Sequence, residues 1–277
     1  MTKPHEIADL LSLMDSLRDK EFGCNWDKKQ TLKTLTGYTL EEVYEVIDAV
    51  DTNDDAQLQD ELGDLLFQVV FYAQIAKEEG RFDFNDVIGS ITDKLLRRHP
   101  HVFPDGSLTS FGNSDLHLNA DEVALRWEQI KNEERALKAK RKGDVSSHSV
   151  LDDVPNSLPA LDRARKLQKR AASVGFDWTN VQDVLDKLKE EIAELEAELV
   201  LNDTKKIHEE FGDLMFSCVN VARHLQLDPE SVLRESNRKF ERRFRAVEGI
   251  AMGQGRTLES FNVEELDRMW RQVKGQE

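Results

Sequence analysis

Four acidic side chains in the second half of the sequence have the types and the spacing of metal ligands: Glu191, Glu194, Glu210 and Asp213. Within each pair the residues are three positions apart, so they share one face of a predicted helix. The stretch LNDTKK (201–206) predicts a short turn between two antiparallel helices, which would bring the four carboxylates face to face. Carboxylates this close repel one another unless a cation lies between them. A ligand set made only of oxygen favours Mg²⁺, with Mn²⁺ as a substitute.

Several residues flank this acidic set. Glu190 and Glu209 each stand one position before a predicted ligand, and either of them could orient or deprotonate an attacking water molecule. Lys187 and Lys206 precede the two acidic stretches, where each is either a phosphate contact or an ordinary surface lysine. A glycine inside a helix costs about 1 kcal/mol relative to alanine. We therefore expect Gly212 to let a ligand or a partner helix approach the backbone, although packing between helices alone would also explain it.

A cationic motif follows in the segment NRKFERRFRAVE. Within it, Lys239, Arg242 and Arg243 fall within about one turn of a predicted helix. Arginine suits bidentate recognition of phosphate, and lysine suits point-charge contacts. The alternative is a helix surface covered by ion pairs, which is the better interpretation for Arg238 and Arg245.

Aromatic residues supply the third part of the pattern. Trp270 and Lys274 are one helical turn apart near the C-terminus, and Trp270 either stacks on a base or covers a core. Trp178, in GFDW, is either structural or a wall of a substrate pocket. Acids with a metal ion, then cations, then an aromatic ring suit a nucleotide, because the metal and the cations would bind its phosphates and the ring its base.

The sequence contains the same arrangement twice, which indicates a tandem duplication. GCNWDKKQ (23–30) parallels GFDWTNVQ (175–182), and ELGDLLF (61–67) parallels EFGDLMF (210–216). EEVYE likewise parallels EEIAE, at the same distance from the second acidic motif in both halves.

Hydrophobic spacing predicts the elements that must position these residues. Apolar residues recur at helical intervals in most segments, as at Ile7, Leu10, Met14 and Leu17, and strand-like alternation is scarce. The sequence therefore predicts an all-α fold made of two tandem helical-bundle domains. The expected division is an N-terminal domain at 1–142, a linker rich in Gly, Ser and Pro at 143–160, and a C-terminal domain at 161–277.

Composition narrows the classes of function. The 54 acidic residues outnumber the 38 basic ones, and the net charge of −16 argues against a nucleic-acid partner. Cys24 and Cys218 form no zinc or disulfide pattern, which fits a reducing cytosol. The longest apolar run, at 65–76, is too short to cross a bilayer, and the N-terminus has no signal-peptide pattern. We therefore expect a cytoplasmic protein without a membrane partner.

Taken in order, these motifs resemble a known family. EExxE…ExxD, followed by KFxRRF and a terminal WxxVK, is similar to MazG, a family of all-α nucleoside triphosphate pyrophosphohydrolases. The resemblance extends over nearly the whole chain, including the tandem arrangement and the connector VLDDVPNSLPAL. It implies Mg²⁺-dependent conversion of an NTP or dNTP to the nucleoside monophosphate and pyrophosphate. It also implies a homodimer whose sites form at or near the subunit contacts.

The resemblance also implies roles for individual residues by motif position. The metal ligands would be Glu191, Glu194, Glu210 and Asp213. The residues around the substrate would be Lys187, Glu190, Lys206, Glu209, Lys239, Arg242, Arg243, Trp270 and Lys274. The equivalent N-terminal metal set would be Glu42, Glu45, Glu61 and Asp64, with Glu41 beside it.

The N-terminal half departs from the family pattern. Asn25 stands where a proline is expected, and Leu32 stands where a histidine is expected. Its basic motif, KLLRRHPHVF, contains Pro100, which would end the helix soon after Arg98, whereas the C-terminal motif continues helically. We therefore expect the C-terminal domain to do most of the catalysis and the N-terminal domain to be weaker, structural or regulatory.

Other functions stay open beside this one. A related pyrophosphohydrolase acting on dUTP or phosphoribosyl-ATP would share the metal motif. A non-catalytic helical regulatory scaffold would suit the duplication, but it would not explain why acidic and basic motifs recur in order. A di-iron site lacks its Glu-x-x-His motif. A calcium loop at 51–62 has Ala56 and Leu62 where glycine and glutamate are required.

Overall fold

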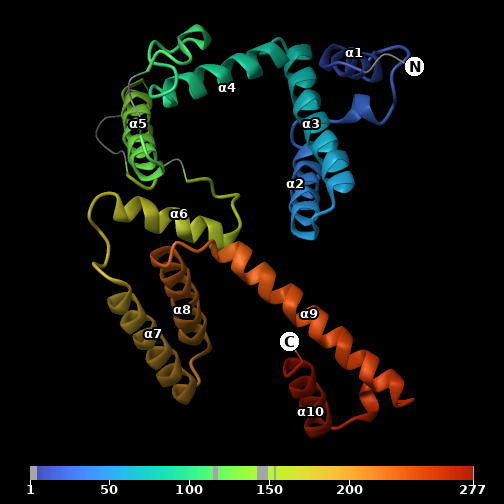
Figure 1. Cartoon of the computed structure of the whole chain (residues 1–277), viewed down its shortest axis with the longest axis vertical. Coiled ribbons are helices and arrows are strands. Elements are labelled where there is room, and N and C mark those ends of the chain that lie inside the picture. Colours follow the sequence, from blue (N-terminus) through green and yellow to red (C-terminus); the bar gives the residue numbers. More distant parts are fainter. Residues whose placement is uncertain (1–4, 115–117, 142–148, 153, 277) are drawn as a thin grey trace. The chain divides into compact units, whose positions relative to one another are not determined.

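The computed structural model of this chain describes residues 5–114, 118–141, 149–152 and 154–276. These residues form α-helices and short 3-10 turns, with no strand among them, which confirms the all-α prediction. The chain divides into two compact units, residues 1–138 and 139–277 (Figure 1). This division falls just before the predicted linker at 143–160, of which residues 143–148 and 153 lie outside the described ranges.

The first unit contains five helices among the residues described. They are α1 (Ile7–Leu17), α2 (Leu35–Thr52), α3 (Asp55–Glu78), α4 (Phe84–Arg98) and α5 (Ala120–Arg141). Helices α2 and α3 pack along one another as a hairpin, and α1 packs against α3. The core under this hairpin consists of Met14, Leu35, Val70, Phe71 and Ile75.

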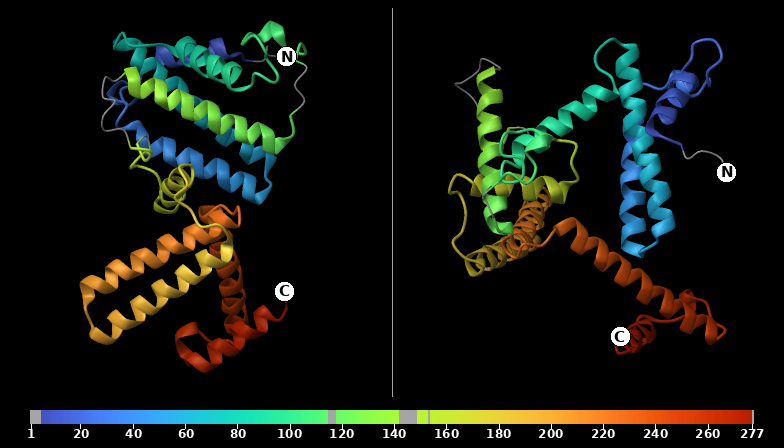
Figure 2. Two further views of the ribbon diagram at one scale, coloured as in Figure 1. Left: turned by 90° about the vertical axis from the view of Figure 1, so that its left-hand side faces the viewer. Right: turned by 45° about the horizontal axis from the view of Figure 1, so that its top comes forward.

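The second unit repeats the hairpin. Its helices are α6 (Ala160–Ala172), α7 (Val181–Leu201), α8 (Thr204–His224), α9 (Pro229–Gly253) and α10 (Val263–Lys274). Helices α7 and α8 lie side by side, as Figures 1 and 2 show from different directions, and α6 packs across α8. The antiparallel pair that the stretch LNDTKK predicted is therefore present.

The same turn closes both hairpins. Asn53 and Asn202 each end a helix in the left-handed conformation with φ 55°, a conformation that asparagine tolerates better than most residues. The next residue caps the following helix: the Asp54 carboxylate accepts from two backbone N–H groups of α3, and Asp203 does the same for α8. This turn determines which faces of the two helices meet.

Helix α9 leaves the hairpin of the second unit. It contacts α6 and α8 near its start and then diverges from α7 and α8, while α10 folds back against its far end (Figure 1). A separate small core holds α9 and α10 together through Val247, Ala251, Phe261, Met269 and Val273. The position of α9 matters for the site because this helix carries the cationic motif.

Candidate metal centre and adjoining pocket

Three of the four predicted C-terminal ligands converge. One carboxylate oxygen each from Glu191, Glu194 and Glu210 lies within 4.8 Å of the others. The first two come from α7 and the third from α8, so the cluster spans the hairpin. Asp213 lies on α8 within its electrostatic reach and lines the adjoining pocket. The separation suits a shared hard cation, because each carboxylate supplies the oxygen ligands that Mg²⁺ prefers.

Electrostatics at the cluster favour a cation. Partial burial, and then the negative charges of Glu194 and Asp213, raise the pKa of Glu210 above its ordinary value. Glu191 is more deeply placed, with 5% of its surface exposed. A divalent ion would relieve the repulsion that these carboxylates exert on one another.

Two predicted lysines lie against this cluster in different ways. Lys187 Nζ is 2.8 Å from Glu190 Oε1 and 2.9 Å from Glu191 Oε1. Contacts with these two carboxylates raise the pKa of Lys187. Lys206 Nζ is 3.3 Å from Glu198 Oε1, on the next turn of α7 after the ligands. Lys187 therefore contacts the metal cluster, whereas Lys206 lies beyond the cluster, on the side of the turn that joins α7 and α8.

A pocket of about 330 Å³ adjoins the cluster and shares Lys187, Glu191 and Asp213 with it. Its apolar walls are Leu151, Leu167, Ala171, Phe176, Trp178 and Phe216. Its remaining polar lining is Gln168, Asp177, Ser217, Asn220 and Arg223. A flat, largely apolar group could therefore lie beside a metal-bound phosphate, which is the geometry that a nucleotide needs.

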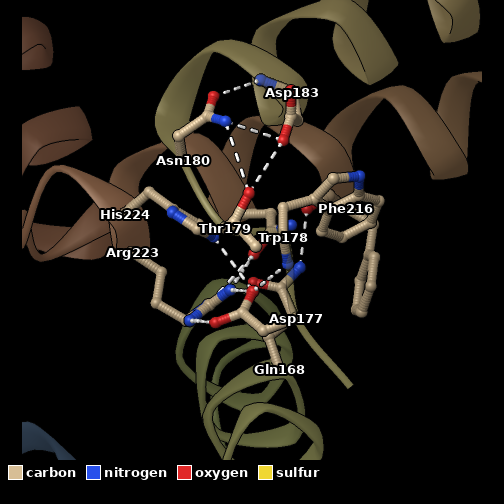
Figure 3. Close-up of polar contacts among 10 residues, drawn as sticks. Gln168, Asp177, Trp178, Thr179, Asn180, Asp183, Phe216, Arg223 and His224 are labelled. Carbon is tan, nitrogen blue, oxygen red and sulfur yellow. Dashed lines mark hydrogen bonds and ion pairs between the residues drawn. The ribbon is translucent and has the colours of Figure 1, made fainter. Parts of the chain in front are cut away.

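A partly exposed polar network holds the loop that bears Trp178 (Figure 3). Arg223 Nη1 donates to Asp177 Oδ2 over 2.9 Å, Arg223 Nη2 donates to Asp177 Oδ1, and His224 Nε2 lies 3.0 Å from that oxygen. Hydrogen bonding from Arg223 lowers the pKa of Asp177 to about 2. The loop between α6 and α7 is thus anchored to the last turn of α8. Trp178, in this loop, forms one wall of the pocket.

Two amide side chains line the same pocket. Gln168, on α6, donates from Nε2 to the Phe216 carbonyl oxygen over 2.8 Å, while its Oε1 is buried without a hydrogen-bond partner. Asn220 Oδ1 accepts from Arg223 Nε over 3.0 Å. Sequence reasoning did not single out Gln168, Asn220 or Arg223. One signal was present, since Ser217 and Asn220 continue the helical face of Asp213 inside an otherwise apolar run.

The remaining predicted substrate residues are elsewhere in the second unit. Lys239, Arg242 and Arg243 lie on α9, which diverges from the hairpin (Figure 1). Trp270 packs its ring 5.4 Å from that of Phe240, on the surface shared by α9 and α10. Lys274 ends α10. The lining of the pocket includes none of these five residues.

Gly212 has no close neighbour within the described part of the chain. A Cβ atom placed there would meet no other atom within 4 Å, and the same is true of Gly63. Packing between helices of one chain therefore does not account for this glycine.

The first unit keeps the acidic cluster. Oxygens of Glu42, Glu45 and Glu61 lie within 4.8 Å of one another, and partial burial, then Asp64, raise the pKa of Glu42. Gln68 Nε2 contacts Glu42 Oε1 over 3.5 Å. The N-terminal set thus matches the C-terminal set in its geometry.

The first unit differs at the positions that form the pocket. With ELGDLLF aligned on EFGDLMF, Gln68 and Phe71 stand where α8 has Ser217 and Asn220. Gln68 is 6% exposed and Phe71 1% exposed, and Phe71 is part of the N-terminal core. Larger side chains therefore fill the space that the second unit leaves open.

The basic motif of the first unit is engaged within the chain. Arg97 Nη2 and Arg98 Nη2 lie 2.8 Å and 2.6 Å from the two oxygens of Glu134. These contacts, the one from Arg98 first, lower the pKa of Glu134 to about 2. Helix α4 ends at Arg98, which confirms the early end predicted from Pro100.

The first unit also lacks both lysines of the second acidic site. Tyr38 and Gln57 stand at the positions of Lys187 and Lys206.

Among the described residues, no helix combines the length and the apolar character needed to cross a bilayer.

Comparison with known proteins identifies relatives over almost the full length. The sequence profile described as "MazG nucleotide pyrophosphohydrolase domain" matches twice, at residues 30–103 and 179–247. The chain is 54% identical over 275 residues to an Escherichia coli protein named "Nucleoside triphosphate pyrophosphohydrolase", covering 99% of this chain and 98% of that protein. It is 43% identical over 269 residues to a Thermotoga maritima protein named "Nucleoside triphosphate pyrophosphohydrolase/pyrophosphatase MazG". This match covers 97% of this chain and 96% of that protein.

Proposed function

Because the chain belongs to the MazG nucleotide pyrophosphohydrolase family, we propose that it hydrolyses nucleoside triphosphates, both NTP and dNTP, to the monophosphate and pyrophosphate with Mg²⁺. The observation that carries this proposal is the carboxylate cluster of α7 and α8 beside a pocket of about 330 Å³. One end of this site suits phosphates and the other suits a nucleoside. We further propose a cytoplasmic location, where the unpaired Cys24 and Cys218 stay reduced.

The donor set fits a divalent ion held by Glu191, Glu194, Glu210 and Asp213. When bound, Mg²⁺ would supply positive charge for the phosphates and would make a water molecule more acidic. The chain itself supplies the groups around this centre. Lys187, already at the cluster, neutralises charge on the phosphates as pyrophosphate leaves. Either Glu190, which pairs with Lys187, or Glu209, which lies 3.7 Å from Lys205, takes the proton from the attacking water.

We assign turnover mainly to the C-terminal half. Two differences support this assignment: Phe71 and Gln68 occupy the N-terminal pocket positions, and two lysines of the C-terminal site are missing. The N-terminal set of Glu42, Glu45, Glu61 and Asp64 is proposed as a second cation site with a supporting role.

We also propose that the active form is a homodimer. A second copy of this chain would bring to the cluster the substrate residues that α9 and α10 of the same copy carry away from it; these residues are Lys239, Arg242, Arg243, Trp270 and Lys274. Exposed apolar side chains on the site-bearing helix support this arrangement, because Phe211 is 54% exposed and Met215 is 41% exposed beside the open position of Gly212. Lys206 would contact the substrate once phosphates draw it from Glu198.

The direct test is pyrophosphate release from a panel of NTPs and dNTPs with Mg²⁺. Glu194→Gln should lower kcat on the order of 100-fold or more while the protein stays folded, because one ligand of the cluster is lost. Glu45→Gln, the matched change in the first unit, should keep most of the activity. Equal loss in both variants would contradict the assignment to the C-terminal half. No release from the wild type on any nucleotide would refute the proposed function and favour a helical scaffold.

A further inference from the structure

Resting on the proposed function, we infer that Arg223 is a positioning residue for the nucleoside. It orients the Asn220 amide toward the pocket, and it holds the loop bearing Trp178 through Asp177. Among the described residues, the hydrogen-bond partners of Arg223 are Asn220 and Asp177 rather than the carboxylates of the metal cluster, so its effect is confined to the nucleoside end of the site.

The orientation of Asn220 follows from its partner. Arg223 Nε and Nη2 both donate to Asn220 Oδ1, over 3.0 Å and 2.8 Å. A guanidinium has no acceptor, so only the amide oxygen can face it. Asn220 is 6% exposed and lines the pocket. Its NH₂ group is therefore the part of the amide left to donate to a bound ligand.

Arg223 uses its other edge to hold the pocket wall. Its two terminal nitrogens bind both oxygens of Asp177, the residue immediately before Trp178, and the Trp178 backbone N–H donates to Asp177 Oδ1 over 2.9 Å. The Arg223 side chain is only 16% exposed and that of Asp177 25% exposed. A charge pair sheltered in this way loses much of its solvation, so removing one partner affects the other strongly.

Gln168 supplies the complementary group. Its NH₂ is engaged by the Phe216 carbonyl, which can only accept, so the orientation of this amide is also determined. Its Oε1 is a buried acceptor of the pocket that has no hydrogen-bond partner among the described residues. The pocket thus offers one oriented donor and one oriented acceptor between apolar walls. A nucleoside has this chemistry, since its flat base carries donors and acceptors at its edge.

The duplication provides an internal comparison. Aligned on the two motifs, Asn25, Phe71 and Gln74 stand in the first unit where Asp177, Asn220 and Arg223 stand in the second. All three members of the network are therefore replaced together in the half whose pocket position is filled. This joint replacement is what a shared role at the nucleoside end predicts.

The test separates nucleoside binding from phosphate binding. Arg223→Gln should raise the KM for ATP roughly tenfold or more, with kcat within about threefold of wild type because the metal cluster is unchanged. Inhibition by tripolyphosphate, which lacks a nucleoside, should be unaltered. Arg81→Gln, which breaks an exposed arginine–glutamate pair in the first unit, should change none of these values. An equal weakening of ATP and tripolyphosphate would overturn the inference.

A second variant distinguishes a lost contact with the nucleoside from misfolding. Asn220→Asp keeps an acceptor for Arg223 but removes the donor, so the KM for ATP should rise while the melting temperature is unchanged or higher. Calorimetry with α,β-methylene-ATP should show the same losses of affinity in both variants, independently of turnover. If the wild type binds this analogue but does not hydrolyse ATP, the proposed function fails. The affinities of the two variants for the analogue then still test the inference. Unchanged affinity in both variants would refute the inference alone, and no binding by the wild type would refute both.

Discussion

At the scale of single residues, the site is a compromise between function and stability. Glu191, Glu194 and Glu210 place carboxylate oxygens within 4.8 Å of one another. Without a cation this closeness costs stability. Partial burial, and then the charges of Glu194 and Asp213, raise the pKa of Glu210. Lys187 offsets part of the charge, but it cannot replace a ligand that binds all of the carboxylates at once.

One prediction follows from this repulsion. In the absence of metal, Glu210→Gln should raise the free energy of unfolding, because it removes one like charge. The same variant should lose the Mg²⁺-induced rise in melting temperature and most turnover. Thermal unfolding with EDTA and with Mg²⁺ measures both effects. Glu196→Gln, an exposed change on α7 outside the cluster, is the control, and a Glu210→Gln protein less stable than wild type in EDTA would contradict the idea.

A second prediction concerns acid stability. The Arg223 contact lowers the folded-state pKa of Asp177 to about 2, below the ordinary value. The pair therefore stabilises the fold fully above about pH 4, and this contribution is lost as the pH falls toward 2. After discounting for solvent screening, Asp177→Asn should cost roughly 1–2 kcal/mol at pH 7. Denaturant unfolding from pH 7 to pH 3 should show the wild-type advantage shrinking; a pH-independent difference would exclude the charge pair as its cause.

At the scale of elements, the two helix hairpins determine where the acids meet. Each hairpin closes through an asparagine with φ 55° followed by a capping aspartate, Asn53–Asp54 and Asn202–Asp203. The turn sets the register of α7 against α8, so it sets the distance between ligands on the two helices. A local capping motif thereby controls the geometry of the metal site.

The matched caps allow a paired test. Asp203→Ala and Asp54→Ala should each cost about 1 kcal/mol of stability, because each removes a side-chain acceptor at a helix start. Only Asp203→Ala should also weaken Mg²⁺-dependent turnover, since α8, unlike α3, carries ligands of the catalytic site in the proposed assignment. Chemical denaturation and the Mg²⁺ dependence of pyrophosphate release measure the two effects. Loss of turnover in Asp54→Ala alone would reverse the assignment of the halves.

At the scale of the whole molecule, the two copies of the duplicated fold differ at the position of the pocket. The first unit packs Phe71 into its core, whereas the second has Asn220 at the aligned position and keeps a pocket. The second unit also carries its cationic motif on α9, away from its own acids (Figure 1). In the proposed homodimer, this separation makes each site depend on both copies.

Mixing two inactive variants tests that dependence. If one copy supplies Glu194 and the other Arg243, a mixture of Glu194→Gln and Arg243→Gln should regain about a quarter of wild-type activity, because half of the dimers carry one intact site of two. Each variant alone should remain inactive. Sedimentation would establish that mixed dimers form. Mixed dimers without recovered activity would show that each site draws both residues from one copy.

The sequence by itself determined the all-α class, the duplication, both acidic sets and the turn between α7 and α8. These features depend on local rules: side chains three positions apart share a helix face, and Asn–Asp turns close hairpins. The early end of α4 at Arg98 was likewise readable from Pro100. The spacing of Glu191, Glu194 and Glu210 was enough to anticipate their convergence, because only one short turn separates the two helices.

Only the tertiary structure decided the pocket, its polar network and the separation of α9 from the cluster. Gln168, Asp177 and Asn220 come from different elements, and their approach depends on how α6 and a loop pack on α8. The sequence placed Lys239, Arg242 and Arg243 in order after the acids, but order along the chain does not specify the direction in which a helix leaves a bundle. Periodicity is a property of one helix, whereas a pocket is a property of the contacts among several.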